Sequence, residues 1–163
     1  MDVKIRQELT LMIRALYFCV ENRWGEIGKA VELSTAQQHL LFLLSTNENA
    51  LTPTEIGKLG CWHVSTVTRL VKTLQSRGIV EVNNHPNKSR FKLVSMTDDG
   101  KDVLRQIHRS FRQMDQVPFE LESLSEQQIK AFIQTGQKLL DVHKGEEYRS
   151  KVINAHIKES DLA

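Results

Sequence analysis

The order of apolar and polar side chains predicts that this chain begins with two helices. Along residues 3–30, apolar side chains recur every three or four positions, which is the spacing of one face of a long amphipathic helix. They are Ile5, Leu9, Met12, Leu16, Val20, Trp24 and Ile27. Ser34 and Gln37 then form a Ser-x-x-Gln capping box, and the leucines that follow cover more than half of the next helix. We therefore expect a long helix over 3–30, followed by a helix that is buried on most sides.

A short helix is predicted next, over about residues 53–59. Thr52, Pro53 and Glu55 supply an N-cap, a first-turn proline and a capping acid in the order that starts a helix. Gly60 is expected to close it, because glycine readily adopts the left-handed conformation found just past a helix end. Only a tight turn then remains before helical spacing resumes.

The helix after that turn, over residues 63–77, has one apolar face and one polar face. Its apolar residues are Val64, Val67, Leu70, Val71 and Leu74. Arg77 and Gly78 are expected to end it, since a cation and a glycine are both favoured at a helix C-terminus. Two helices are thus predicted on either side of a tight turn.

The hydrophobic period changes after this helix pair. Residues 79–84 and 91–96 are rich in β-branched or aromatic side chains with partial alternation, which is typical of strands. Between them, residues 85–90 read "HPNKSR", a proline-containing turn with two cations. A β-hairpin with a basic tip is therefore expected.

The remainder of the chain predicts helices again. Thr97, followed by two aspartates, caps a helix that carries Val103, Leu104, Ile107 and Phe111 on one face. A kink is expected near Pro118, because proline interrupts a helix. Ser125 and Gln128 form a further capping box, and the last helix places Ile129, Phe132, Ile133, Leu139 and Leu140 on one face. The apolar run "VINAHI" is expected to extend that helix beyond Gly145.

The polar face of residues 63–77 suits double-stranded DNA. Its candidate contacts are His63, Ser65, Thr66, Thr68, Arg69, Lys72 and Thr73. Short hydroxyls suit phosphates near a helix N-terminus, and Arg69 is long enough to reach a guanine edge, whereas His63 is equally well explained as a turn residue. An ordinary solvated helix face would also be polar. No acid occurs from 62 to 80, however, and a basic hairpin follows, so the joint pattern favours DNA.

A tight helix pair whose second helix leads into a hairpin is the winged helix-turn-helix arrangement. The predicted fold class is mainly α with a small β-hairpin wing, framed by N- and C-terminal dimerisation helices. We expect one domain over 1–163, in which 34–100 form the DNA-binding lobe and 1–33 and 101–163 the dimerisation helices. The apolar stripes at the two ends favour a homodimer, because they are longer than one small lobe can cover.

The overall charge adds little to this interpretation. The 22 Lys and Arg residues nearly balance the 20 Asp and Glu residues, so affinity for nucleic acid must come from local clusters of charge. Further candidates for phosphate contacts are Lys58, Arg77, Lys88 and Lys92. No apolar run is long enough to span a bilayer, and no signal peptide is recognisable. A cytoplasmic protein that does not bind membranes is expected.

The sequence contains no recognisable catalytic, metal or cofactor motif. There is no glycine-rich phosphate loop and no nucleophile elbow, so an enzyme is not expected. The six histidines do not pair with one another, or with Cys or acids, at ligand spacing, and neither a metal nor another cofactor is predicted. Cys19 and Cys61 are too few for a disulfide framework and are expected to be thiols that pack in the helices and their turn.

The runs "LTPTEIGKLGCWHVSTVTRLVKTLQSRGIVEV" and "LVSMTDDG" resemble the DNA-binding core of the MarR family of transcription regulators. The resemblance implies that the first and last helices of two subunits interlock as a homodimer. It also implies that the helix matching 63–77 reads the major groove of a pseudo-palindromic operator and that the hairpin tip, 85–90, reaches the minor groove. A small-molecule effector between the dimerisation helices and the lobes is a further implication. The run "HVST" is similar to the Hpr-like regulators of protease production and sporulation.

The wing departs from the family pattern. Many members carry Asp-Arg-Arg at the hairpin tip, whereas the same offset here gives Lys88, Ser89 and Arg90. The carboxylate that would orient the arginine is therefore missing, and Lys88 adds attraction for phosphates instead. All three remain candidate DNA contacts.

The expected function is that of a homodimeric transcriptional repressor, since a dimer bound across a promoter blocks polymerase by occupancy. One alternative is a thiol-based sensor, because some members of the resembled family sense peroxides through a cysteine in the region of Cys19. Its neighbours Phe18 and Val20 supply no cation to lower a thiol pKa. The other alternative is a winged-helix module that binds proteins, against which Arg69 and the basic wing argue.

Overall fold

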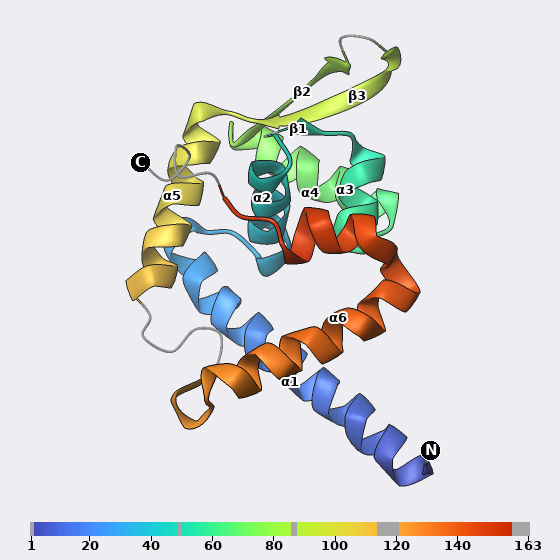
Figure 1. The fold of residues 1–163 in the computed structure, drawn as a ribbon. Coiled ribbons are helices and arrows are strands. Elements are labelled where there is room, and N and C mark those ends of the chain that lie inside the picture. The colour runs from blue at the N-terminus through green and yellow to red at the C-terminus, as the bar shows by residue number, and fades with distance from the viewer. Residues whose placement is uncertain (1, 49, 86–87, 114–120, 158–163) are drawn as a thin grey trace.

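The computed structural model describes residues 2–48, 50–85, 88–113 and 121–157 (Figure 1). Its elements in chain order are α1 (Val3–Val31), α2 (Thr35–Thr46), β1 (Ala50–Leu51), α3 (Pro53–Gly60), α4 (Val64–Ser76), β2 (Val80–His85), β3 (Lys88–Met96), α5 (Asp98–Gln113), the 3-10 turn η1 (Leu121–Ser123), α6 (Glu126–Tyr148) and the π-helical turn η2 (Arg149–Ile153). The protein is mainly helical with one hairpin wing, which confirms the predicted fold class. None of the described helices is long and apolar enough to cross a membrane.

The core is built around α2. Four of its leucines, Leu40, Leu41, Leu43 and Leu44, are completely buried, as expected for a helix that is apolar on most sides. The elements around it contribute Ile56, Val67, Leu74 and Val94, which are completely buried as well. Burial of this apolar area is the main force that holds α3 and α4 in place.

The three predicted capping boxes are all present. Ser34 caps α2 with Gln37, Thr52 caps α3 with Glu55, and Ser125 caps α6 with Gln128. In α3 the backbone N–H of Thr52 donates to Glu55 Oε2 at 2.8 Å, and this bond holds the pKa of Glu55 below its ordinary value. Each box satisfies backbone donors that a helix start leaves without partners.

The turn between α3 and α4 differs from the prediction by one residue. Gly60 is the last residue of α3, and Cys61 is the one in the left-handed conformation, with φ 58°. The glycine is required for a different reason, because a Cβ at this position would clash with the Trp62 ring. The prediction was wrong because the close approach of Trp62 is a packing contact that local spacing does not reveal.

The wing belongs to a three-stranded antiparallel sheet with strand order β1-β3-β2. Val82 pairs with Val94, and the register shifts between Asn84 and His85. Strand β1 was not predicted, because two residues are too short to show a pattern. The predicted six-residue turn was also too long: His85 belongs to β2, and residues 88–90 belong to β3. Residues 86–87 lie outside the described residues.

The last helix does not continue through "VINAHI" as expected. Gly145 breaks it with φ 76° and ψ 175°, a combination that only glycine adopts readily. Val152 and Ile153 lie in the π-helical turn η2, and residues 154–157 follow without helical structure. The kink predicted near Pro118 lies outside the described residues.

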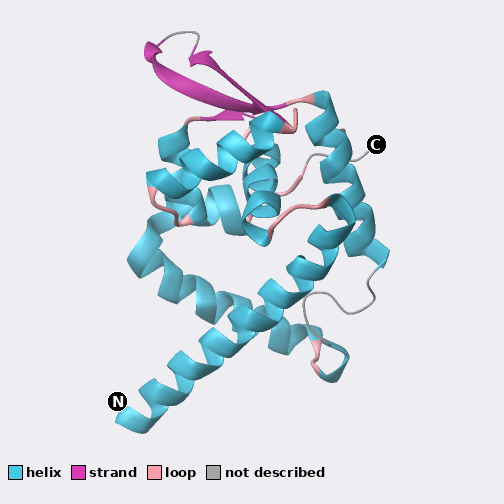
Figure 2. Ribbon diagram, turned by 180° about the vertical axis from the view of Figure 1, so that it is seen from behind, coloured by secondary structure: helices cyan, strands magenta, loops and turns pink. Residues whose placement is uncertain are grey.

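Helices α1 and α6 extend away from the lobe that contains the core. Figures 1 and 2 both show the N-terminal part of α1 projecting beyond the other elements. Only Ile27, Gly28 and Val31 of α1 are buried, and none of the described residues of α6 is. Their exposed large apolar side chains include Val3, Ile5, Leu9, Leu11, Met12, Ile13, Tyr17, Phe18, Phe132, Ile133, Leu139, Leu140 and Val142. The outer part of each predicted apolar stripe therefore lies uncovered in a single chain, whereas Ile27 is buried and Leu16, Val20, Trp24 and Ile129 are half-buried.

Candidate nucleic-acid interface

Helix α4 presents two chemically distinct faces. Val67, Leu70, Val71 and Leu74 are buried against the core. The opposite face exposes Ser65, Thr68, Arg69, Lys72 and Thr73, and Thr66 is half-buried beside them. Val64, expected on the apolar face, is instead 48% exposed, because it stands in the first turn beyond the edge of the core. The predicted polar surface is thus present, and it contains no acid.

The first turn of α4 is capped by His63. The Ser65 backbone N–H donates to His63 Nδ1 at 3.3 Å, and the Ser65 hydroxyl lies 2.8 Å from the same nitrogen. His63 is therefore a turn residue, one of the two roles considered for it. Because Nδ1 accepts, the neutral ring carries its proton on Nε2, so the exposed side chain retains a donor. A phosphate contact by that donor stays a prediction.

Two hydroxyls of this face already use their protons within the helix. Thr68 Oγ1 donates to the Val64 carbonyl at 3.0 Å, and Thr73 Oγ1 donates to the Arg69 carbonyl at 3.1 Å. In these rotamers they can accept hydrogen bonds but cannot donate to a phosphate oxygen. Arg69 and Lys72 form no ion pair within the described residues, so they are the charged donors available for DNA on this face.

The hairpin adds further cations beside this face. Arg90 is exposed on β3, and the alternation of a strand places it on the same side as Lys92. Lys92 Nζ donates to Asn84 Oδ1 at 2.8 Å across the hairpin, which partly commits it to the wing itself. The backbone of Lys88 and Ser89 lies in β3, with Lys88 paired to His85.

The guanidinium of Arg77 is hydrogen-bonded within the protein and is not free to contact DNA. It donates to the carbonyls of Glu32 at 2.6 Å and Val31 at 3.1 Å, at the C-terminal end of α1. These carbonyls have no acceptor role inside the helix, so a cation is favoured there. The assignment of Arg77 as a phosphate contact is therefore not supported by its position.

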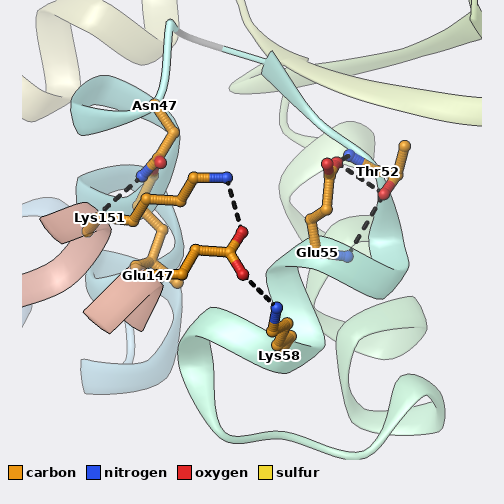
Figure 3. A network of polar contacts seen from close by, with 7 residues as sticks. Asn47, Thr52, Glu55, Lys58, Glu147 and Lys151 are labelled. Carbon is orange, nitrogen blue, oxygen red and sulfur yellow. Dashed lines mark hydrogen bonds and ion pairs between the residues drawn. The ribbon is translucent and has the colours of Figure 1, made fainter. Parts of the chain in front are cut away.

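Lys58 is also paired, in the network shown in Figure 3. Its Nζ lies 2.6 Å from Glu147 Oε2, and Lys151 Nζ lies 3.1 Å from Glu147 Oε1. The Asn47 amide donates to the Lys151 carbonyl at 3.3 Å. Hydrogen bonds from Lys58 and Lys151 hold the pKa of Glu147 below its ordinary value. This network ties the end of α6 to α2 and α3, and hence to the helix pair.

The two cysteines are more exposed than predicted. Cys19 is exposed because the lobe does not cover that part of α1. Cys61 is exposed as well, with its Sγ 3.7 Å from the Tyr148 hydroxyl. Burial, together with Cys61, raises the pKa of Tyr148 to about 12. Neither thiol is the buried packing residue that was expected.

A cavity of about 640 Å³ lies between α1 and α5 on one side and the lobe on the other, where the family resemblance implied an effector site, although no lining residue was predicted. Its walls come from α1, α2, α5, the turn before α4 and the segment after η2. Trp24 stacks on Phe111 with ring centroids 5.6 Å apart, and His39 meets Trp62 edge-on at 5.4 Å. Its residues come from distant parts of the sequence, so no local pattern marks it. Among the described residues, no three His, Cys, Asp or Glu side chains come together as metal ligands do.

The sequence is similar to that of known transcription regulators. Residues 33–90 match the family model described as the MarR family. HTH-type transcriptional regulator Hpr of Bacillus licheniformis is 29% identical over 105 residues, 64% of this chain and 50% of its own. The DNA-binding transcriptional repressor ScoC of Bacillus subtilis is 28% identical over 105 residues, 64% of this chain and 51% of its own. The chain thus spans about half the length of the curated relatives it matches.

Solved structures share the fold. A mutant MarR from E. coli complexed with operator DNA aligns with a TM-score of 0.71 and 22% identity, over 86% of this chain and 99% of its own. The organohalide-sensing regulator RdhR in its 2,4-dichlorophenol-bound form aligns with a TM-score of 0.71 and 16% identity, over 91% and 86% of the two chains. The Hpr-like resemblance is confirmed by the curated relatives. The match to the MarR family model covers the helix pair and most of the hairpin, and the chain shares the winged helix-turn-helix fold of solved MarR proteins.

Proposed function

We propose that this protein is a homodimeric, DNA-binding transcriptional repressor that recognises a pseudo-palindromic operator. The observation that carries the proposal is the exposed, acid-free face of α4 beside a cationic hairpin. The fold is shared with a MarR protein solved on operator DNA, and the relative ScoC is named a repressor. Such a role places the protein in the cytoplasm, with double-stranded DNA as its partner.

Helix α4 lies in the major groove in this proposal, and Arg69 reads a base edge there. Arginine contacts the two acceptors of guanine in the major groove with a bidentate geometry that distinguishes base pairs. The residues around it position the helix by contacting phosphates: His63, Ser65, Thr66, Thr68, Lys72 and Thr73. Lys88, Ser89 and Arg90 act from the wing, with Arg90 in the minor groove.

The dimer is formed by α1 and α6. Their apolar side chains, among them Ile5, Met12, Phe132 and Ile133, are exposed in the single chain, and contiguous exposed apolar faces of this kind usually mark an interface. A twofold dimer presents two copies of α4, so an operator with two related half-sites follows from the symmetry.

Selection of bound fragments from a random duplex library, followed by fluorescence anisotropy on the enriched sequence, tests the proposal. We expect one enriched sequence with two inverted half-sites, bound more tightly than a scrambled duplex by a factor on the order of 10³ or more. A library that yields no enrichment at low salt would contradict it.

Neither alternative function is favoured by the comparisons. The relatives are named as transcriptional regulators, not as protein-binding modules or thiol sensors. The exposed Cys19 has Phe18 and Val20 beside it along the chain, and neither is a cation. The cavity instead supports regulation by a small molecule that binds beside the lobe. Other proteins of this fold have been solved with 2,4-dichlorophenol, or studied for regulation by 6-hydroxynicotinic acid.

A further inference from the structure

The cavity is large enough for a drug-sized molecule, and several aromatic side chains line it. Its volume of about 640 Å³ lies in the range of small-molecule sites. Trp24 and Trp62, the two tryptophans of the sequence, line it together with Phe42 and Phe111. Aromatic faces attract flat apolar rings, and they also attract cations through the ring quadrupole.

The fixed charge of the cavity wall is negative. Glu21 is the acid among the described residues that line it, and none of those residues is a lysine or an arginine. The Thr35 hydroxyl donates to Glu21 Oε2 at 2.8 Å, and Glu21 forms no ion pair within the described part of the chain. Its carboxylate therefore accepts a hydrogen bond from Thr35 and forms no ion pair with a lysine or arginine of the described chain.

Another polar side chain on the wall, besides Glu21 and Thr35, is the amide of Gln38. Gln38 lines the cavity and is 2% exposed. Its Nε2 donates to the Trp24 carbonyl at 2.9 Å and to the Leu33 carbonyl at 3.3 Å, which fixes the orientation of the amide. Its Oε1 is buried and accepts no hydrogen bond. The amide of Gln38 is thus a fixed, uncharged part of the wall and does not balance the charge of Glu21.

Two of the three histidines that line the cavity, His39 and His108, do not add positive charge to it. Burial lowers the pKa of His39, although the neighbouring Glu21 carboxylate raises it. Burial and the nearby charge of Arg112 lower the pKa of His108. Both rings are therefore neutral at physiological pH. Arg112 acts on His108 but is not among the residues that line the cavity.

We infer that this cavity binds a flat aromatic organic cation that carries N–H donors, such as an aryl-alkyl ammonium compound. The ring lies among the tryptophans, and the ammonium group lies against the Glu21 carboxylate. An aromatic carboxylate is excluded, since it would bring a second negative charge against Glu21 with no cation on the wall to receive it. The regulatory meaning of this ligand rests on the proposed function, whereas its binding does not.

Three probes with one biphenyl body test the inference on the full chain: 4-phenylbenzylammonium, 4-phenylbenzyl alcohol and 4-biphenylcarboxylate. Quenching of tryptophan fluorescence, excited at the red edge, reports binding because both tryptophans line the cavity. We expect the ammonium compound to bind more tightly than the alcohol by on the order of tenfold, with little binding of the carboxylate. Equal affinity for all three, or preference for the carboxylate, would overturn the inference without any mutation.

The variant Glu21→Gln then locates the source of the preference. It keeps an acceptor for Thr35 and removes the charge, so the ammonium and alcohol affinities should become nearly equal while that of the alcohol stays unchanged. Glu26→Gln is the matched control, since Glu26 lies on the same helix, pairs with Arg23 and is absent from the cavity wall. A preference that survives Glu21→Gln assigns the cation site elsewhere and refutes the inference.

The failure of this inference and that of the proposed function are distinguishable. Binding of the operator by ligand-free protein is measured separately and does not depend on the probes. A protein that binds operator but shows no preference for the cation refutes the inference alone. A protein that prefers the cation but binds no duplex refutes the proposed function alone. If both hold, the ammonium compound should change operator affinity in the unchanged protein more than in Glu21→Gln.

Discussion

Arg69 is exposed between Val67 and Leu70, which are both buried, so the helix itself directs this guanidinium outward. We predict that Arg69→Ala costs about 1–3 kcal/mol per half-site on the operator and barely weakens binding to random duplex. Fluorescence anisotropy on operator and scrambled duplex measures both values, with circular dichroism to exclude unfolding. Lys72→Ala is the matched control and should weaken the two duplexes equally. Undiminished discrimination by Arg69→Ala would show that α4 is not the reading helix.

Substitution of Arg90 should affect DNA binding differently from substitution of Arg69, because Arg90 lies on the wing. An arginine that senses the width and charge of the minor groove contributes to every duplex. We predict that Arg90→Ala weakens operator and scrambled DNA more evenly and makes the slope of log affinity against log salt shallower. Titrations at several salt concentrations measure this slope. A selective loss on the operator alone would assign base reading to the wing.

His39 should make the fold sensitive to mild acid. Burial lowers its pKa below 6.5 in the folded protein, so the unfolded chain binds the proton more readily as the pH falls. Its contribution to stability is complete above pH 6.5 and is lost as the pH falls toward the folded pKa; His108 acts in the same direction. We predict a lower Tm at about pH 5.5 than at about pH 7.5, and a smaller difference in His39→Gln.

Differential scanning fluorimetry across this range provides the measurement. The carboxylates whose pKa is lowered, Glu55, Glu147 and Asp98, lose their contribution only as the pH falls below 4.5 and do not interfere. His143→Gln removes an exposed imidazole and should leave the pH dependence as it is in the unchanged protein. An identical pH dependence in His39→Gln would show that this histidine does not couple protonation to folding.

At the scale of elements, local signals predicted the helices well because their causes are local. Each capping box lies within four consecutive residues, and each amphipathic face repeats over a few turns. Strand β1 was not predicted because its two residues are too few to show an alternating pattern. Gly60 was given the wrong role because its constraint comes from the packing of Trp62.

Contacts between distant elements could not be predicted from spacing. The face of α4 was correct in all but Val64, since burial along a helix follows its period. The pairing of Arg77 with the end of α1 crosses 45 residues, and that of Lys58 with Glu147 crosses 89. The walls of the cavity come together only in the folded chain. The polar face of α4 could therefore be predicted from the sequence. That Arg77 and Lys58 are paired within the protein, and so are not free to contact phosphates, could not.

Arg77, at the end of α4, binds the C-terminal end of α1, so its removal should lower the stability of the fold. We predict that Arg77→Ala lowers the free energy of unfolding by about 1 kcal/mol, because two carbonyls at the end of α1 lose a charged donor. It should leave the salt slope of DNA binding unchanged. Denaturant unfolding and the DNA titration measure the two effects. Lys72→Ala provides the opposite pattern, with unchanged stability and a shallower slope. A shallower slope in Arg77→Ala would return this residue to the phosphate contacts.

At the scale of the whole molecule, the exposed apolar faces of α1 and α6 and the polar face of α4 are both accounted for by a dimer that binds DNA. A chain that exposes residues such as Ile13, Phe18, Phe132 and Leu139 should pair, and pairing gives the two copies of α4 that a half-site arrangement needs. The network around Glu147 joins α6 to α3, so the proposed dimer interface on α6 would be coupled to the position of the helix pair. Oligomeric state and DNA binding are therefore expected together.

Sedimentation velocity of a fluorescently labelled operator duplex, with the protein added at several salt concentrations, examines both at once. We predict a protein that is dimeric without DNA, a complex of two chains per duplex at low salt, and a negative slope of log affinity against log salt on the order of several units. A monomer with full helical content that forms no complex with the duplex at low salt would contradict the dimer and the DNA-binding function together.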